Sequence, residues 1–167
     1  SDFPDSAAAA KAKKRISEIQ REARKTELEA VKRAIDKAEQ LVAAGEYGKA
    51  LKYVNDALKV QRRFLSDKDM KELRGLPRSI REKARAMFAE IASRFQRRAL
   101  KEDCDALKKE LVSTYERVGV AELEGMFNAA LEKIDGIKSE RLEKARKELA
   151  LELKKVRELE SKRSYAG

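Results

Sequence analysis

The stretch that decides the fold runs from Val31 to Phe64 and reads VKRAIDKAEQLVAAGEYGKALKYVNDALKVQRRF. Its apolar residues recur at the three- and four-residue spacing of an amphipathic helix on either side of Gly45-Glu46-Tyr47. Glycine disfavours a helix interior and favours a turn, so the pattern breaks there. The apolar positions are Ala34, Ile35, Ala38, Leu41 and Val42 before the break, and Ala50, Leu51, Val54, Ala57 and Leu58 after it. The stretch therefore predicts two short antiparallel helices, a helical hairpin.

The hairpin resembles one tetratricopeptide repeat, in which small residues let two helices approach and a glycine with an aromatic residue marks the turn. The residues that match in order are Ala38, Leu41, Gly45, Tyr47, Ala50, Val54, Ala57 and Leu58. The chain departs from the family at Ala34, Lys37 and Arg62, where an aromatic residue, a leucine and a proline are usual. No second copy follows at the family's spacing.

The resemblance implies binding of a peptide or helix on a concave face formed around Tyr47, Leu51 and Tyr53. A generic helical hairpin, or one of the microtubule-interacting-and-transport type, fits the same residues. These alternatives differ in function but agree on the local structure.

The composition predicts an all-α protein. Of the 167 residues, 42% are charged and 5% are aromatic, so a core must come from narrow stripes of Leu, Ile, Val and Ala. Only two prolines and seven glycines interrupt the chain, and the alternating apolar pattern of strands is absent. We expect a helical bundle of about six helices with long N- and C-terminal helices, in a single domain over residues 1–167.

The residue types that most catalytic and metal sites require are scarce. The chain has no histidine and one cysteine, Cys104, which removes the usual zinc and haem ligands and the usual base of a Ser or Cys nucleophile. The glycines stand apart, so no phosphate loop of the Walker or dinucleotide type is formed. Catalysis by carboxylates alone is left open, but the acidic residues alternate with Lys and Arg as on solvated helix faces. We predict a non-enzymatic protein with no cofactor, no metal and no small-molecule substrate.

The expected location is the cytoplasm. No apolar run approaches the 18 or so residues of a membrane span, and the run Ala7 to Ala10 is too short for a signal sequence. A lone cysteine fits a reducing compartment. Binding to an anionic membrane surface ranks last among the functions, because the basic N-terminal segment lacks large aromatic residues.

The first helix is predicted over residues 6–44, since nothing breaks the helical pattern before Gly45. Its second half packs in the hairpin, whereas Ile16 and Ile19 in its first half lie on a different face. That face needs either the last helix folded back or a neighbouring subunit. The helix also begins with a basic cluster, which is either a solvated end or a polyanion contact. The cluster is Lys11, Lys13, Lys14 and Arg15.

Most of the excess positive charge lies in one segment. Residues 59–101 carry 14 basic and 5 acidic residues, a net charge of +9 out of +10 for the chain. The second hairpin helix is predicted over 46–64, a short helix is expected to end at Gly75-Leu76-Pro77, and a basic helix follows over 78–98. Its cations flank an apolar stripe on two sides: Arg78, Arg81 and Arg85 on one, Lys83, Arg94, Arg97 and Lys101 on the other.

Arginine suits bidentate contacts to phosphate and carboxylate, so this basic helix predicts docking of nucleic acid or of an acidic protein surface. Pairing of the same cations with acidic residues of the C-terminal third is the alternative.

Three further helices are predicted over 103–117, 121–135 and 137–163, with Gly136 stopping or bending the chain between the last two. The last helix carries apolar residues near coiled-coil spacing. We expect this seam to pair with the Ile16 stripe of the first helix, within the chain or across subunits. The residues assigned to protein binding on this helix are Leu142, Leu149, Leu151 and Val156.

Together these features predict a structural or scaffold protein that self-assembles through its long helices and docks a polyanion, most plausibly nucleic acid, on the basic helix. The expected partners are a second copy of the chain or another helical protein, with nucleic acid as the possible ligand. The alternative function is a protein-binding adaptor of the tetratricopeptide-like hairpin type.

Overall fold

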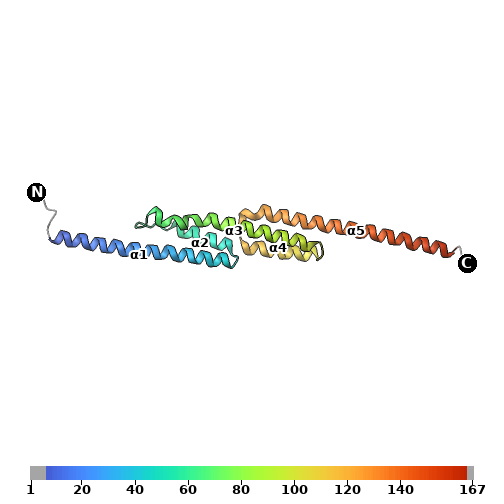
Figure 1. The fold of residues 1–167 in the computed structure, drawn as a ribbon, viewed down its shortest axis with the longest axis horizontal. Coiled ribbons are helices and arrows are strands. Elements are labelled where there is room, and N and C mark those ends of the chain that lie inside the picture. Colours follow the sequence, from blue (N-terminus) through green and yellow to red (C-terminus); the bar gives the residue numbers. More distant parts are fainter. Residues whose placement is uncertain (1–6, 165–167) are drawn as a thin grey trace. The chain divides into compact units, whose positions relative to one another are not determined.

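The computed structural model describes residues 7–164, with side chains as far as residue 161, and within this range it contains helices and turns but no strand. The helices are α1 (Ala7–Ala43), α2 (Tyr47–Lys59), α3 (Asp67–Ala99), α4 (Cys104–Val118) and α5 (Glu124–Ser164), with a short 3-10 helix, η1 (Ala121–Leu123), before α5 (Figure 1). The prediction of an all-α protein is confirmed. The predicted start of the first helix at residue 6 lies outside the described residues.

The predicted number of about six helices is wrong, because the described residues form five α-helices. Pro77 lies inside α3, although proline removes a backbone donor and costs about 3 kcal/mol in a helix interior. Leu73 and Ile80, one turn on either side, are both buried, so packing keeps the helix continuous. Gly136 likewise lies inside α5, two residues after the fully buried Ile134.

The chain divides into two compact units, which we describe one at a time. Unit 1 comprises residues 1–85 and 117–121, and unit 2 comprises residues 86–116 and 122–167. Both units therefore use part of α3. A single domain over the whole chain stays a prediction.

Unit 1 is built on the hairpin that the sequence predicted. The second half of α1 packs along α2 (Figure 1), and the first part of α3 adds a third layer of apolar side chains. Each helix contributes residues at helical spacing to one shared core. The buried residues include Val31, Ala34, Ile35 and Ala38 of α1, Ala50, Leu51 and Val54 of α2, and Met70, Leu73, Ile80 and Ala84 of α3.

The turn between α1 and α2 is a glycine-terminated helix cap. Gly45 has a φ of +76°, the left-handed conformation that glycine adopts without steric cost. Its N–H donates to the carbonyl of Val42 at 2.9 Å, and the N–H of Glu46 donates to the carbonyl of Leu41 at 2.9 Å. This pair of bonds is the Schellman motif, which satisfies carbonyls at the end of α1.

A second glycine in unit 1 allows two backbone segments to touch. Gly48, in the first turn of α2, lies against the backbone of Gly119. A Cβ atom built on Gly48 would come within 2.6 Å of the Gly119 carbonyl carbon and closer still to its oxygen. The segment 117–121 can therefore approach α2 this closely only because residue 48 has no side chain.

Unit 2 has its core between the end of α3, α4 and the first half of α5. Phe88 is fully buried and meets the ring of Tyr115 edge-on, with centroids 6.1 Å apart. Tyr115 in turn stacks on Phe127 at 4.4 Å. Aromatic pairs of this kind add to the stabilisation from buried area. The other buried residues include Ile91, Phe95 and Ala99 of α3, Cys104, Leu107 and Leu111 of α4, and Leu123, Ala130 and Ile134 further on.

Among the described residues, no other helix of the same unit packs against the outer half of α1 or of α5 (Figure 1). In unit 1, the last contacts of α1 toward its N-terminus include Arg24 with Asp69 and Glu27 with the backbone N–H groups of Arg63 and Phe64. In unit 2, Arg141 of α5 donates hydrogen bonds to carbonyl oxygens at the α3–α4 turn. Residues 7–23 and 142–161 are consequently almost entirely exposed.

Candidate functional site

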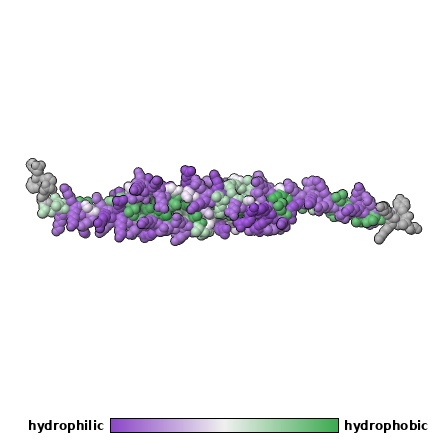
Figure 2. Space-filling view, viewed as in Figure 1, coloured by the Kyte–Doolittle hydropathy of each residue, from purple (hydrophilic) through white to green (hydrophobic). Residues whose placement is uncertain are grey.

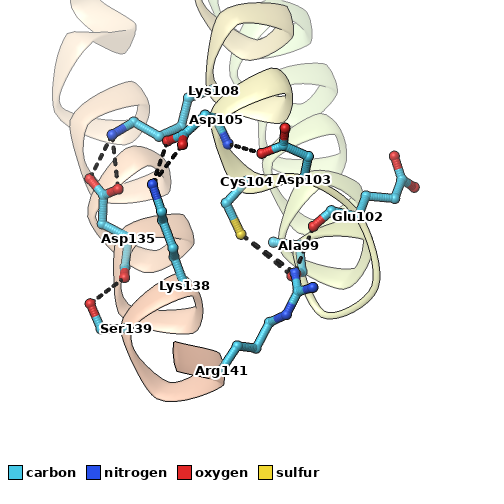
Figure 3. Close-up of polar contacts among 10 residues, drawn as sticks. All are labelled: Ala99, Glu102, Asp103, Cys104, Asp105, Lys108, Asp135, Lys138, Ser139 and Arg141. Carbon is cyan, nitrogen blue, oxygen red and sulfur yellow. Dashed lines mark hydrogen bonds and ion pairs between the residues drawn. The ribbon is translucent and has the colours of Figure 1, made fainter. Parts of the chain in front are cut away.

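Ion pairs tie α5 to α4 in unit 2, as Figure 3 shows. The ammonium of Lys138 donates to both carboxylate oxygens of Asp105, at 2.8 and 2.6 Å. Lys108 makes the same double contact with Asp135, at 2.8 and 2.9 Å. The hydrogen bond and charge of Lys138 lower the pKa of Asp105, and the hydrogen bond that Lys138 donates to Asp105 raises the pKa of Lys138. These contacts are partly exposed, so they align the two helices more than they stabilise them.

Arg141 closes the end of this row of contacts. Its Nη1 atom donates to the carbonyl oxygens of Ala99 at 2.8 Å and Glu102 at 2.6 Å, at the C-terminal end of α3 (Figure 3). Such carbonyls have no partner within their own helix, and a cation there also opposes the negative end of the helix dipole. The buried thiol of Cys104 lies 3.8 Å from the same nitrogen. Sequence reasoning missed this contact, because no local pattern links Arg141 to residues about forty positions earlier.

A shallow cavity of about 490 Å³ adjoins this corner of unit 2. Polar residues of the α3–α4 turn line one side of it, and Leu142 and Ala145 of α5 line the other. The cavity thus opens where the exposed apolar seam of α5 begins. The cavity is lined by both charged and apolar side chains.

The predicted polyanion-binding residues that α3 contributes to unit 1 all lie on the exposed side of that helix. Arg78 donates to Glu82 at 2.8 Å, and this hydrogen bond raises the pKa of Arg78. Lys83 and Arg85 make no ion pair among the described residues. This part of α3 therefore presents positive charge to solvent. The exposed members are Arg78, Arg81, Lys83 and Arg85.

The predicted residues of unit 2 are Arg94, Arg97 and Lys101, which are exposed and make no ion pair with any residue that the structure describes. Their neighbour Arg98 behaves differently. It lies over the ring of Phe95 at 5.2 Å and pairs with Glu102 and Glu110, which raises its pKa. Internal pairing with acidic residues, the alternative raised from the sequence, thus applies to Arg98 and not to its neighbours.

The basic cluster at the start of α1 is exposed throughout. Arg15 makes an ion pair with Glu18 at 3.6 Å, one turn along the helix. Lys11, Lys13 and Lys14 make no ion pair with the described part of the chain. The cluster has no other element of unit 1 against it.

The face assigned to peptide binding on the hairpin is mostly core. Tyr47 and Leu51 are each 8% exposed and pack inside unit 1, whereas Tyr53 is 42% exposed. Helical periodicity identifies an apolar face but does not tell whether another element covers it. A groove on this hairpin would have to use other residues.

The protein-binding residues assigned to the last helix are all exposed on α5. Leu142, Leu149 and Val156 lie along one seam, and Leu151 points away from it, as expected from the 100° rotation per residue. Hydrophobic patches are visible along this part of α5 in Figure 2. On α1, Ile16 and Ile19 are 55% and 53% exposed. Each stripe therefore lacks a cover in its own unit.

Metal-binding clusters and membrane-spanning helices add no further candidate within the described residues. No group of three or more Asp, Glu or Cys side chains in this part of the chain is placed to hold a metal ion. None of the helices between residues 7 and 164 combines the length and apolarity needed to cross a membrane. The candidate sites are thus the basic side of α3, the basic start of α1, and the two exposed apolar stripes. Among known proteins, no family model, curated protein or solved structure matches this chain.

Proposed function

We propose that the protein is a non-enzymatic scaffold that self-assembles through the outer halves of α1 and α5 and binds nucleic acid through the basic residues of α3. The observation that carries the self-assembly is the exposure of regularly spaced leucine, isoleucine and valine side chains on both helices, with Leu149 and Leu159 at 62% and 63%. Contiguous exposed apolar surface of this kind marks interaction sites.

The nucleic-acid half of the proposal is supported by the side chains of α3 that remain without an acidic neighbour. Arg85, Arg94 and Arg97 are exposed and unpaired among the described residues, in a segment with few acidic residues. A guanidinium group donates two parallel hydrogen bonds to a phosphate, which favours phosphate contacts over simple solvation. We assign phosphate binding to two basic groups, one in unit 1 that includes Arg85 and one in unit 2 that includes Arg94 and Arg97.

Self-assembly is tested by light scattering over a concentration series. The apparent mass should rise with concentration, and a monomer at every concentration would contradict the proposal. Because the proposed association buries the apolar side chains of α1 and α5, which salt does not screen, it should persist at moderate salt.

Nucleic-acid binding is tested by fluorescence anisotropy with labelled duplex DNA and single-stranded RNA at about 50 and 200 mM salt. The variant Arg94→Gln with Arg97→Gln, and separately Lys83→Gln with Arg85→Gln, should weaken binding. Each should also reduce the salt dependence, by about 0.9 in log–log slope for every duplex phosphate that the variant no longer neutralises.

The matched control, Lys147→Gln with Arg157→Gln, removes the same charge from α5 and should bind like the unmodified chain. Equal affinity of all variants would remove α3 from the site. If the chain binds an acidic protein but not DNA or RNA, the basic residues of α3 serve a protein partner and the nucleic-acid proposal is overturned.

A further inference from the structure

The two exposed apolar stripes lie on helices with opposite directions relative to the packed core of their unit. The chain runs toward the core along α1 and away from the core along α5. The outer half of α1 leads into the packed core of unit 1, and the outer half of α5 leads out of the packed core of unit 2. If α5 of one copy overlaps α1 of the next copy, both helices run away from the first copy and toward the second. The overlap is then parallel, the orientation in which a and d positions of a heptad pair with the same positions of the partner.

We propose that α5 of one copy pairs in parallel with α1 of a second copy, with residue 156 level with residue 16. This inference rests on the self-assembly proposed above and names its partner surface. In this register Val156 faces Ile16 and Leu159 faces Ile19, so four exposed apolar residues of the two stripes cover each other.

The preceding heptad of the seam, from Leu149 to Glu152, fits the same register. Leu149 faces Ala9, and Glu152 faces Ala12, whose small side chain leaves the carboxylate room to reach solvent. Glu152 already pairs with Lys155, one turn further along α5, at 2.9 Å.

The charges that flank the seam select this register. In a parallel pair, a g residue of one helix meets the e residue five positions further on in the other. Glu148 then meets Lys13 of the second copy, and Glu160 meets its Arg15, two attractive contacts between exposed side chains. The present partners of these residues are exposed neighbours on the same helix, Glu18 for Arg15 and Lys144 for Glu148 at 3.9 Å.

Shifted registers lose this complementarity. A shift of one heptad in one direction brings Arg141 against Lys13 and Glu160 against Glu22. A shift in the other direction brings Lys155 against Lys13. Like charges at these positions repel each other, so the charged residues beside the seam disfavour both shifted registers.

Antiparallel pairing of each helix with its own copy is also disfavoured. An antiparallel pair of α1 helices with Ile16 facing Ala12 brings Lys13 against Lys13 and Arg15 against Arg15. An antiparallel pair of α5 helices with Leu142 facing Leu159 places Glu152 of each copy against Leu149 of the other. Compared with these two antiparallel pairs, the mixed pair both joins opposite charges and keeps the large apolar residues together. Because it uses two different surfaces, it produces chains or rings of copies.

A charge-swap experiment on the full chain tests the pairing. The α1 variant Lys13→Glu with Arg15→Glu, and the α5 variant Glu148→Lys with Glu160→Lys, should each raise the concentration for half-association about tenfold. An equimolar mixture of the two variants should restore association, because α5 of each variant then meets a complementary α1 of the other. The readout is apparent mass by light scattering.

Matched controls change the same charges on the outer faces of the same helices. These are Lys11→Glu with Lys14→Glu on α1 and Glu143→Lys with Glu158→Lys on α5, and both should associate like the unmodified chain. If the unmodified chain associates but the Lys13 and Arg15 variant associates equally well, the α1–α5 pairing is overturned and self-assembly stands. If the unmodified chain is monomeric throughout, both the pairing and the proposed self-assembly are overturned.

Discussion

At the scale of single residues, the contact between Gly48 and Gly119 is the most demanding in unit 1. The first turn of α2 and the 117–121 segment touch through their backbones, so even a methyl group at position 48 collides with the Gly119 carbonyl. Gly136 in α5 is the opposite case, because nothing lies within 4 Å of its missing Cβ. A substitution at Gly48 therefore tests the steric need for glycine, whereas a substitution at Gly136 tests only helix propensity.

We expect Gly48→Ala to destabilise the protein by about 1–3 kcal/mol, since inserting atoms into a packed contact forces the backbone to shift. Gly136→Ala should stabilise it by roughly 1 kcal/mol through helix propensity alone. Chemical denaturation followed by circular dichroism measures both. Equal effects of the two substitutions would show that the Gly48–Gly119 contact does not form in solution.

The ion pair between Asp105 and Lys138 predicts a pH dependence. The folded-state pKa of Asp105 is lowered from its ordinary value of 3.8, so its carboxylate stabilises the fold above that pH and loses this effect as the pH falls through the lowered pKa. The thermal midpoint of Asp105→Asn should lie below that of the unmodified chain at pH 5 to 7, and the difference should vanish at acid pH. Glu132→Gln, at an exposed residue without an ion pair in the described structure, should show no such dependence.

At the scale of elements, α3 shows packing overriding a local stop signal. Gly75-Leu76-Pro77 is a strong helix terminator by propensity, yet α3 runs through it as one helix of 33 residues, Asp67–Ala99. The buried residues before and after Pro77 belong to the same apolar face of unit 1, and a break would take one of them out of the core.

We expect Pro77→Ala to stabilise unit 1 by about 1–3 kcal/mol, because the new N–H group can complete the helical ladder. Thermal unfolding measures the change. Ser79→Ala on the same helix, which leaves the backbone donors unchanged, serves as the control. A lower thermal midpoint for Pro77→Ala would mean that the local geometry imposed by proline is part of the packing.

The elements also show what the sequence could and could not predict. The hairpin was predictable because helical spacing and Gly45 act within a few residues of each other. The continuity of α3 and α5 was not, since it depends on neighbours distant in sequence. The same limit explains Tyr47 and Leu51, whose spacing marked an apolar face while their burial is set by the packing of unit 1.

At the scale of the whole molecule, the distribution of charge and apolar surface was predictable and the contacts between elements were not. Residues 59–101 hold nearly all of the net charge, and most of their cations are exposed as expected from the helical projection, although Arg62 and Arg98 are half-buried. By contrast, Arg141 on the carbonyls of Ala99 and Glu102 joins elements through long-range contacts that no motif encodes. Such contacts determine where the packed part of α5 ends and its exposed outer half begins.

The burial of Cys104 beneath this corner has a practical consequence. The chain contains a single thiol, and it is 4% exposed, behind the guanidinium of Arg141. Because the thiol is buried, a thiol reagent should react faster when the turn between α3 and α4 separates from α5, and the rate of alkylation should rise with the opening of that corner. Labelling kinetics at this native position would follow the local opening of unit 2 without any introduced probe.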